Sequence, residues 1–452
     1  MQRTPPRCLI IGAGMAGIGA AIACIRAGLK PIVVESTGYI GGRSRSFIEP
    51  VTGELIDNGQ HLLMGCYNNV LDIATTLGTR HTLHMQKSLE VQFRDTQGSV
   101  DAFGPSRLPS SLGALSSLLR MRSLSLRSKL GALLMMTALR GGYVPSPSLT
   151  ALDVLHSFHQ TPQIIERFWE PFVLATMNAH VSRASGGVLV EVLKRSILAG
   201  GVNSSLVIPR SGLSAIVEPF ADWLSRNGGE LHMHENVEEI VVDQGRCVGV
   251  GLRSGALLDT DAAVLAVPPH AIERIQRSDT GSPIVSLHSS MRGTSAIVST
   301  YMWFDKSFMT EPLCAGIGTT TQWVFNRRAL HDAEPDVVST YPGHITLTTS
   351  AAASVQDEDA ESIVTRSLQE IHQLIPESRT ARMLHSKVIK ERRATMVLTP
   401  EAQEHRPTWK TEISNVVCCG DWTQTRLPAT LEGAAESGIR AVNGLAKGLG
   451  SI

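Results

Sequence analysis

Residues 8–17 read CLIIGAGMAG, a short apolar run that leads directly into a glycine-rich turn. The apolar run Cys8–Ile11 predicts a buried parallel strand, and Met15–Ala27 predicts a helix. Pro31–Val34 predicts a second strand, which ends on Glu35. The order of strand, turn, helix and strand predicts a βαβ unit, and therefore an α/β protein with a Rossmann-like nucleotide-binding domain.

Each glycine of the turn has a mechanical task in such a unit. Gly12 makes the tight turn, Gly14 lets the backbone approach a pyrophosphate, and Gly17 allows close packing of helix on strand. The helix N-terminus offers free N–H groups to phosphates. Glu35 follows the glycines by about 20 residues, which is the spacing that reaches a ribose hydroxyl. The alternative is a glycine-rich turn with only a structural role.

The same stretch imitates an export signal, because Arg3 and Arg7 precede an uncharged run and residues 21–24 read AIAC. Its glycines, and the loss of the phosphate-binding loop that cleavage would cause, favour the nucleotide site. The seven cysteines show no CxxC spacing, which argues against a disulfide framework and a zinc site. We therefore expect a cytoplasmic protein without a bound metal. Lys plus Arg equals Asp plus Glu at 41 each, so no nucleic-acid partner is expected.

At 452 residues the chain is long enough for two domains. Further short strands are predicted at 236–242, 247–252, 262–267 and 416–419, and a C-terminal helix at 431–445. We expect a discontinuous nucleotide-binding domain and an inserted α+β substrate domain. The first comprises 1–85, 205–275 and 405–452; the second, which lacks the βαβ rhythm, comprises 86–204 and 276–404.

Two motifs narrow the nucleotide fold. Gly41-Gly42-Arg43-Ser44 follows the βαβ unit, and Gly420-Asp421-Trp422-Thr423 precedes the run Leu431–Gly438, LEGAAESG. Together they resemble the FAD-binding superfamily of amine oxidases, protoporphyrinogen oxidase and carotenoid desaturases, including phytoene desaturase. The resemblance implies FAD, with Arg43 near its pyrophosphate, Asp421 on its ribityl or phosphate part, and the helix after Leu431 pointing at the flavin pyrimidine ring. A positive helix end there would stabilise the anionic reduced flavin.

Three longer stretches, 57–67, 168–178 and 421–434, resemble the hydroxysqualene dehydroxylase family within this superfamily. No His or Cys stands in a recognised attachment setting, so FAD is expected to be bound noncovalently. The residues that the motifs and the resemblance assign to FAD are Gly12, Gly14, Met15, Ala16, Gly17, Glu35, Ser36, Gly42, Arg43, Ser44, Asn58, Gly59, Gln60, His61, Val237, Gly420, Asp421, Leu431, Glu432, Gly433 and Ala434.

The resemblance implies reductive removal of the allylic hydroxyl of hydroxysqualene, in hopanoid synthesis, with hydride passing from reduced flavin N5 to an allylic cation. The departing water needs an acid. His61 and Asp57, on the segment that by resemblance runs beside the isoalloxazine, and Glu170, on the presumed substrate wall, are the candidates. Structural roles compete with these: Asp57 caps the turn at 58–59, Glu170 pairs with Arg167, and His61 serves packing or hydrogen bonding.

Other functions remain open. A carotenoid-type desaturase or other isoprenoid hydrocarbon oxidase would use the same scaffold in the opposite redox direction, and a lipid-binding escort resembling the Rab GDP-dissociation inhibitors would use no flavin. An amine oxidase is disfavoured, because the place of its aromatic cage holds Leu427-Pro428-Ala429-Thr430. A nicotinamide-dependent reductase is disfavoured because the chain has no second GxGxxG unit. The electron donor is left open.

Residues 102–152 contain no Asp or Glu. A helix over Leu112–Leu139 would expose apolar side chains and basic heads together, which is typical of a segment on an anionic membrane surface. We therefore expect a long isoprenoid substrate and peripheral association with the inner face of the cytoplasmic membrane. The alternative is an amphipathic core helix with solvated cations. The basic residues are Arg107, Arg120, Arg122, Arg127, Lys129 and Arg140.

Overall fold

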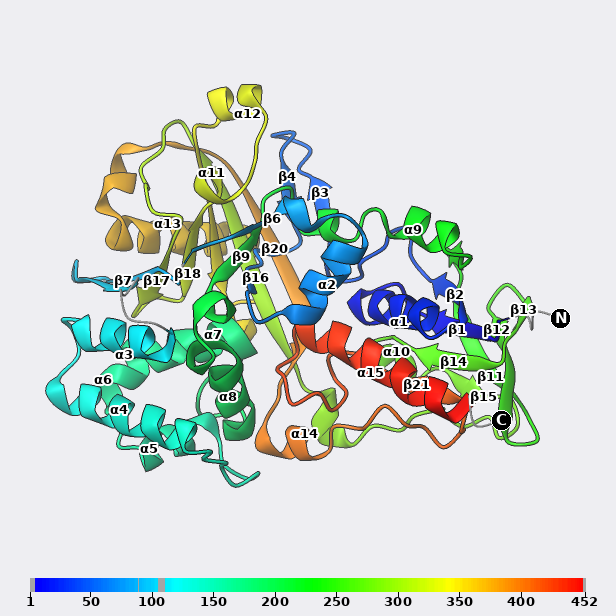
Figure 1. Ribbon diagram of the computed structural model, residues 1–452. Helices are drawn as coiled ribbons and strands as arrows, with labels where there is room; N and C mark the ends of the chain where they lie inside the picture. Colours follow the sequence, from blue (N-terminus) through cyan, green and yellow to red (C-terminus); the bar gives the residue numbers. More distant parts are fainter. Residues whose placement is uncertain (1–4, 88, 105–109, 450–452) are drawn as a thin grey trace.

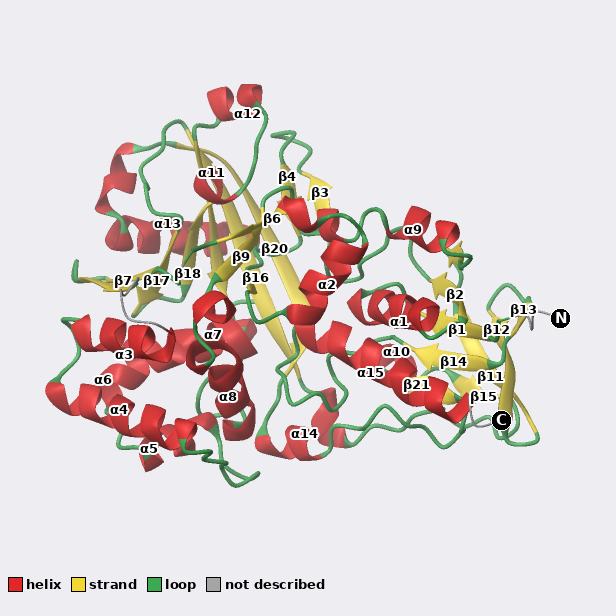
Figure 2. Cartoon of the chain, in the orientation of Figure 1, coloured by secondary structure: helices red, strands yellow, loops and turns green. Residues whose placement is uncertain are grey.

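A computed structural model describes residues 5–87, 89–104 and 110–449 of the chain (Figure 1). The predicted basic residue Arg107 lies outside these residues. One end of the molecule is built around a parallel sheet near the two chain termini, and a second, larger sheet stands beside it. A group of helices occupies the remaining corner (Figure 2).

The parallel sheet has five strands in the order β10-β2-β1-β14-β21, and all four pairings are parallel. Its strands come from three separate stretches of the chain, within 7–35, 230–265 and 416–418. The strands and helices predicted for the nucleotide-binding part are confirmed within one to four residues at their ends. The elements are β1 (Arg7–Ile11), α1 (Met15–Arg26), β2 (Lys30–Glu35), α9 (Phe220–Arg226), β10 (Glu230–Met233), β14 (Ala262–Leu265), α10 (Pro269–Ile272), β21 (Val416–Cys418) and α15 (Leu431–Leu449).

Helices α1 and α15 pack with their backbones in contact. A Cβ on Gly438 would lie 2.0 Å from the carbonyl oxygen of Ala16, and one on Gly19 would lie 3.0 Å from that of Ala435. Only glycine permits the first approach. The glycine that ends the LEGAAESG motif therefore fixes the distance between the two helices that begin at the predicted cofactor.

A small four-stranded sheet and two short sheets surround the nucleotide-binding part. The four-stranded sheet contains β11 (Val237–Asp243), β12 (Arg246–Leu252), β13 (Leu257–Asp259) and β15 (Gln276–Arg277). The short sheets contain β3 (Ser46–Ile48) with β4 (Leu55–Asp57), and β5 (Leu63–Met64) with β9 (Leu206–Pro209) and β6 (Leu83–Met85). Helix α2 (Asn68–Thr76) follows β5.

The larger sheet has seven strands in the order β20-β16-β19-β18-β17-β7-β8. Met302, Val324 and Ile345 on one face pack against Ile371 and Leu374 of α13. The elements are β7 (Val91–Asp95), β8 (Val100–Phe103), β16 (Thr294–Phe304), β17 (Leu313–Ile317), β18 (Trp323–Asn326), α11 (Arg327–Leu330), α12 (Pro335–Thr340), β19 (Gly343–Thr349), α13 (Ala360–Leu374), β20 (Met383–Met396) and α14 (Pro400–Glu404).

The basic stretch forms two helices, so the prediction of one helix over Leu112–Leu139 was wrong. The carboxylate of Asp101 accepts the N–H groups of Arg122 and Ser123 at 2.8 and 2.9 Å, and Ser125 caps the second helix. These polar caps interrupt a leucine-rich pattern that continues on both sides. The helices are α3 (Ser110–Arg120), α4 (Leu126–Arg140), α5 (Ala151–Ser157), α6 (Pro162–Ile164), α7 (Glu170–Met177) and α8 (Gly186–Leu193). In the described part of the chain, no helix combines the length and apolar character that a membrane span needs.

Candidate functional site

The three glycines of the first turn differ in what surrounds them. A Cβ on Gly12 would lie 2.7 Å from the carbonyl oxygen of Ala266, and one on Gly17 would lie 1.8 Å from that of Gly12. Around the Cβ position of Gly14 no described atom lies within 4 Å, and this residue precedes the N-terminus of α1. The backbone of Gly14, with the first N–H groups of α1 at Met15 and Ala16, therefore offers open space and donors that fit the FAD pyrophosphate.

Glu35 ends β2 beside this turn. Its buried carboxylate accepts the N–H groups of Ala13 at 2.8 Å and Thr37 at 2.9 Å, and the Ser36 hydroxyl lies 3.3 Å from it. Oε1 also accepts the Thr37 hydroxyl at 2.9 Å, whereas Oε2 accepts only the N–H of Ala13, so an acceptor site remains on Oε2 for a ribose hydroxyl. The N–H of Glu235 donates to the carbonyl of Glu35 at 3.0 Å, which brings the start of β11, and with it Val237, to the same end of the site.

The GGRS loop lies on the glycine turn. The N–H of Gly41 donates to the carbonyl of Ala13 at 2.9 Å, and a Cβ on Gly42 would lie 3.2 Å from the Cα of Gly14. Arg43 Nη2 lies 2.7 Å from Asp421 Oδ2, and the Coulomb attraction of that carboxylate raises the pKa of Arg43. The buried hydroxyl of Ser44 has no partner among the described residues, as expected beside an acceptor-rich phosphate.

The N-terminus of α15 is formed by Thr430. Its hydroxyl accepts the N–H of Gly433 at 3.2 Å and its carbonyl that of Ala434 at 2.9 Å, which leaves the N–H groups of Leu431 and Glu432 for another acceptor. Nearby, the N–H of Gly420 is bound by the Ser437 hydroxyl at 2.8 Å. The first turn of the helix can therefore face the flavin, as the motif implies.

The side chain of Glu432 binds the N-terminus of helix α2. Its carboxylate accepts the N–H groups of Asn69 and Val70 and the side-chain amide of Asn69, at 2.8–3.1 Å, so it caps helix α2. Burial raises the pKa of this carboxyl. Because its carboxylate is used by α2, only the backbone of Glu432 remains for the cofactor. This contact joins residues that are distant in the sequence.

Asp57 is fully buried and acts as a structural bridge. Its Oδ1 accepts the Ser46 hydroxyl at 2.6 Å and the N–H of Leu213 at 2.9 Å, and its carbonyl accepts the Tyr301 hydroxyl at 2.9 Å. Its Oδ2 has no partner in the described structure, and the same is true of Oδ1 of Asn58. The expected cap of the turn at 58–59 is not among these contacts.

Gln60 connects the segment to a buried cation. Its Oε1 accepts from Arg327 Nη1 at 2.9 Å, and its Nε2 lies 3.1 Å from His331 Nε2. Arg327 also donates to the carbonyl of Leu55 at 3.0 Å. Burial, together with the charge of Arg327, lowers the pKa of His331, so this histidine is neutral and accepts from Gln60.

His61 is the one candidate acid whose titratable group is neither fully buried, as in Asp57, nor bound to another titratable side chain, as in Glu170. Its Nδ1 lies 2.6 Å from the carbonyl oxygen of Gly59. A carbonyl only accepts, so Nδ1 carries a hydrogen and Nε2 is the nitrogen that gains or loses a proton. The Nδ1–H of His61 is therefore used by Gly59, and Nε2 is the ring nitrogen left for another contact.

Glu170 begins α7 and binds elsewhere. Its carboxylate lies 2.5 Å from His180 Nδ1 and accepts the N–H of Val181 at 3.0 Å. The alternative pairing with Arg167 was wrong, because Arg167 binds Asp95 at 2.8 Å. Among the described residues, no hydrogen bond or ion pair joins the side chains of His61, Asp57 and Glu170. The three candidates therefore do not form one catalytic group.

A small, mostly enclosed pocket lies directly before the first turn of α15. Its lining is largely apolar, and it contains no aromatic pair at Leu427-Pro428. Burial raises the pKa of Cys66 in its wall to about 11, so this thiol stays protonated. The lining residues are Met64, Cys66, Tyr67, Thr176, Val192, Arg195, Ser196, Leu427, Pro428 and Thr430.

None of these residues was predicted as a site residue. Met64, Cys66 and Thr176 lie in the stretches that carried the narrower resemblance, which was the available signal. Arg195 had none: it lies in a π-helical turn after α8, and its guanidinium binds Glu191 at 2.7 Å and Glu436 of α15 at 2.8 Å. It thereby ties the substrate part to the helix that begins at the cofactor.

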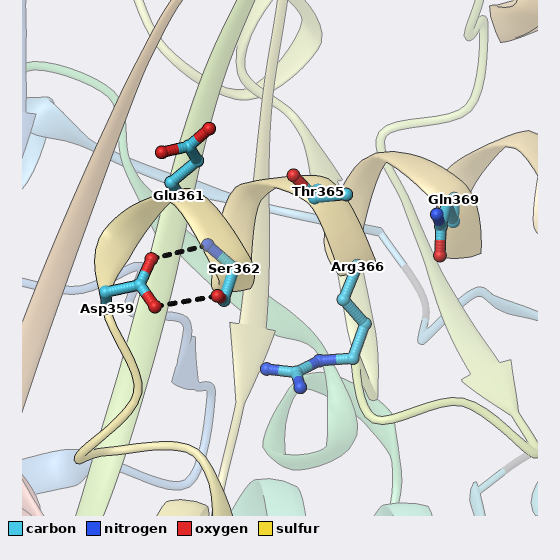
Figure 3. A pocket seen from close by; sticks show the side chains of 6 residues that line it. All are labelled: Asp359, Glu361, Ser362, Thr365, Arg366 and Gln369. Atoms are coloured by element: carbon cyan, nitrogen blue, oxygen red, sulfur yellow. Dashed lines mark hydrogen bonds between the residues drawn. The ribbon is translucent and has the colours of Figure 1, made fainter.

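A second hollow, along α13, has no connection to this chemistry (Figure 3). Asp359 caps the helix by accepting the N–H and hydroxyl of Ser362 at 2.8 and 2.7 Å. Arg366 pairs with Glu358 at 2.8 Å. Helix α13 packs on the face of the large sheet opposite to the 54–61 segment, so this hollow is polar helix surface.

Comparison with known proteins agrees with this geometry. A family described as flavin containing amine oxidoreductase matches residues 15–446. The hydroxysqualene dehydroxylase of Rhodopseudomonas palustris is 29% identical over 445 residues, covering 96% of this chain and 97% of that protein. The 15-cis-phytoene desaturase of Glycine max is 23% identical over 96% of this chain and 78% of its own. The crystal structure of an oxidoreductase from Methanosarcina mazei, 16% identical, superposes with a TM-score of 0.69 over 97% of this chain and 99% of that one.

Proposed function

This chain belongs to the family of flavin-containing amine oxidoreductases, and from that premise we propose that it is a hydroxysqualene dehydroxylase. It is an FAD-dependent oxidoreductase. The proposed reaction replaces the allylic hydroxyl group of hydroxysqualene with hydrogen and gives squalene. The likeness to the Rhodopseudomonas palustris enzyme over nearly the whole of both chains supports this substrate.

The apolar pocket before α15 is the observation that carries the proposal. An amine substrate is a cation at neutral pH, and this pocket contains no aromatic pair to receive an ammonium group. Met64, Val192 and Leu427 instead offer the flexible apolar contacts that suit part of a long hydrocarbon.

The residues of the site divide the work of a dehydroxylation. FAD, when bound and reduced, supplies the hydride. His61 protonates the departing hydroxyl from Nε2, while its Nδ1–H stays on the carbonyl of Gly59. The first turn of α15 directs its N–H groups towards the flavin. The products are the hydrocarbon and one water. The C–O bond breaks, the hydride supplies the two electrons of the new C–H bond, and the proton leaves with the hydroxyl group as water.

Anaerobic turnover tests this function. The purified holoprotein is reduced chemically and mixed with hydroxysqualene, and products are identified by mass spectrometry. Squalene, with one flavin reoxidised per molecule, is expected. Unchanged hydroxysqualene, together with oxidation of a carotenoid precursor by the oxidised enzyme, would instead establish a desaturase on the same scaffold.

We propose further that helix α4 rests on a membrane surface. Its outward face carries Leu126 and Leu130, which are 79% and 65% exposed, and the exposed Leu133. At 100° per residue these three leucines form one stripe, flanked by Arg127 on one side and Lys129 and Arg140 on the other. Acidic residues are absent from 102–152. Apolar side chains inserted between basic heads fit an anionic bilayer, and α4 lies on the side of the molecule away from the chain termini (Figure 1).

This placement fits the proposed substrate. A C30 hydrocarbon partitions into lipid, so an enzyme acting on it gains from contact with the bilayer. Anionic lipids of the inner leaflet would attract the basic stretch, which favours the cytoplasmic face of the cytoplasmic membrane.

A further inference from the structure

Three polar side chains form a row across the large sheet. Ser299 on β16 pairs directly with Thr348 on β19, and Thr348 pairs with Trp323 on β18. Residues paired in this way point to the same face of a sheet, with Cβ atoms about 5 Å apart. We call Ser299, Thr348 and Trp323 the polar row. Its face is opposite to the one covered by α13.

The polar row has hydrogen-bonding groups that the protein does not use. Ser299 is 1% and Thr348 7% exposed, and the indole Nε1 of Trp323 is also buried. In the described parts of the chain, neither hydroxyl nor the indole N–H has a hydrogen-bond partner. A buried polar group without a partner destabilises the fold, and native proteins rarely leave neighbouring ones unsatisfied. Three in one row indicate a bound partner.

The polar row extends from the candidate acid His61 at one end to the apolar core of the helical part at the other. At one end, the Cβ position of Gly59 lies 3.4 Å from Ser299 Oγ and 3.8 Å from His61 Cε1, so the serine hydroxyl and the candidate acid flank the same glycine. At the other end, Trp323 packs against the apolar core that contains Phe168 and Met177 of the helical part. This arrangement fits an alcohol with a long hydrocarbon tail. Its hydroxyl group would lie near His61, and its tail would extend towards the helices.

We propose that the polar row is the recognition site for the hydroxyl group of the substrate alcohol. This inference rests on the proposed function and adds the residues that distinguish the alcohol from a hydrocarbon. Two hydroxyls and an indole N–H can donate to an oxygen that leaves as water, and the hydroxyls can also accept its hydrogen. A substrate without oxygen leaves all three groups unpaired, so the row disfavours squalene and carotenoid hydrocarbons.

The test uses a substitution that keeps the shape and removes the hydroxyl. Thr348→Val is made in the holoprotein with oxidised FAD, which cannot deliver hydride, so hydroxysqualene binds without turnover. Its dissociation constant is measured from the flavin absorbance change, and squalane, the saturated C30 hydrocarbon, is the ligand without oxygen. We expect Thr348→Val to weaken hydroxysqualene binding about tenfold and to leave squalane binding within about twofold. Ser299→Ala should act in the same direction.

Stability of the free holoprotein separates recognition from a structural role. Removing an unpaired buried hydroxyl should leave the melting temperature unchanged or raise it. Thr300→Val is the matched control, because Thr300 is buried on the α13 side of β16, the strand that pairs with β19, and should change neither dissociation constant. A lower melting temperature with equal effects on both ligands would overturn the proposal, because it would assign the hydroxyl to the fold. If the wild type fails to convert hydroxysqualene, the proposed function fails; if it does convert it and Thr348→Val binds it normally, the polar row alone is refuted.

Discussion

Arg43 and Asp421 meet at 2.7 Å, which joins the loop after the first βαβ unit to the end of the last strand of the parallel sheet. Asp421 is almost fully buried, whereas Arg43 is partly exposed and also donates to the carbonyl of Ala394 at 2.8 Å. The ion pair therefore holds the loop after the first βαβ unit against the end of β21, on either side of the predicted cofactor site. Part of the Arg43 guanidinium remains available for phosphate.

Arg43→Ala should weaken FAD binding at least tenfold, because it removes a phosphate-facing cation and leaves a buried carboxylate without its partner. Flavin released during ultrafiltration, measured by fluorescence, reports the change. Arg45→Ala is the control: Arg45 is exposed and lies over the Tyr39 ring at 4.4 Å, and its loss should not alter flavin content. Equal flavin content in Arg43→Ala and the wild type would show that this cation does not serve the cofactor.

Gly14→Val should abolish flavin binding while the protein still folds. Gly14 has φ −75° and no described atom within 4 Å of its Cβ position, so valine meets no protein there and occupies the space assigned to pyrophosphate. Gly293→Val is the matched control, since Gly293 is also open and has φ −67°. The absorbance ratio of flavin to protein measures occupancy, and acid should release yellow flavin from the wild type. A fully yellow Gly14→Val variant would contradict the assignment.

His61→Asn should lower kcat for hydroxysqualene by about 10²–10⁴, because asparagine retains an N–H for the carbonyl of Gly59 and lacks Nε2. The flavin spectrum and content should stay unchanged, which shows that the segment is intact. Single-turnover oxidation of reduced flavin by the substrate measures the step directly. A variant with wild-type rate would exclude His61 as the acid and direct attention to Glu170.

His344→Asn should reduce the sensitivity of stability to mild acid. His344 is fully buried, its Nδ1 donates to Glu54 at 2.9 Å, and burial lowers its pKa to about 3. Below pH about 6.5 the unfolded chain binds a proton that the folded chain does not, so the free energy of unfolding falls with pH by about 1.4 kcal/mol per unit. The variant lacks this loss between pH 6 and pH 4.5.

Glu54 does not disturb this pH window. Burial alone would raise its pKa, but hydrogen bonds from His344 and Arg328 hold the pKa below its ordinary value, so the stability it contributes is lost only at lower pH. Urea unfolding at pH 4.5, 5.5 and 6.5 measures the slopes. His81→Asn, at an exposed histidine, should keep the wild-type slope, and an unchanged slope in His344→Asn would refute the assignment.

Removal of four cations should weaken binding to anionic liposomes by two to three orders of magnitude, since each contributes about 1 kcal/mol near the surface. The variant replaces Arg120, Arg122, Arg127 and Lys129 with Gln, and the flavin spectrum should not change. Salt should weaken wild-type binding but leave a residual due to apolar insertion, which replacement of Leu126, Leu130 and Leu133 with Ser should remove.

A control variant of the same charge separates this surface from general electrostatics. Four exposed arginines elsewhere, replaced with Gln, should leave most of the liposome binding. If both four-residue variants bind like the wild type across the salt range, the cations of α3 and α4 do not face the membrane. The control residues are Arg226, Arg246, Arg253 and Arg379.

The sequence alone determined the nucleotide-binding half, because its constraints are local. The stretch 12–17 contains Gly12 for the tight turn, Gly14 for the approach to pyrophosphate and Gly17 for the packing of the helix. The apolar runs on either side have the length of buried strands. The motifs at 41–44 and 420–423 also have fixed local geometry. These elements were therefore predicted to within a few residues.

Only the tertiary structure decided what the side chains between those motifs do. Asp57 and Glu432 look like site residues in the sequence, yet one bridges Ser46 and Leu213 and the other caps α2. Their partners are distant in the chain, and the polar row arises only when three strands pair in one register. A carboxylate or hydroxyl acquires its role from the donors that folding brings within about 3 Å, and no pattern of neighbours along the chain encodes that distance.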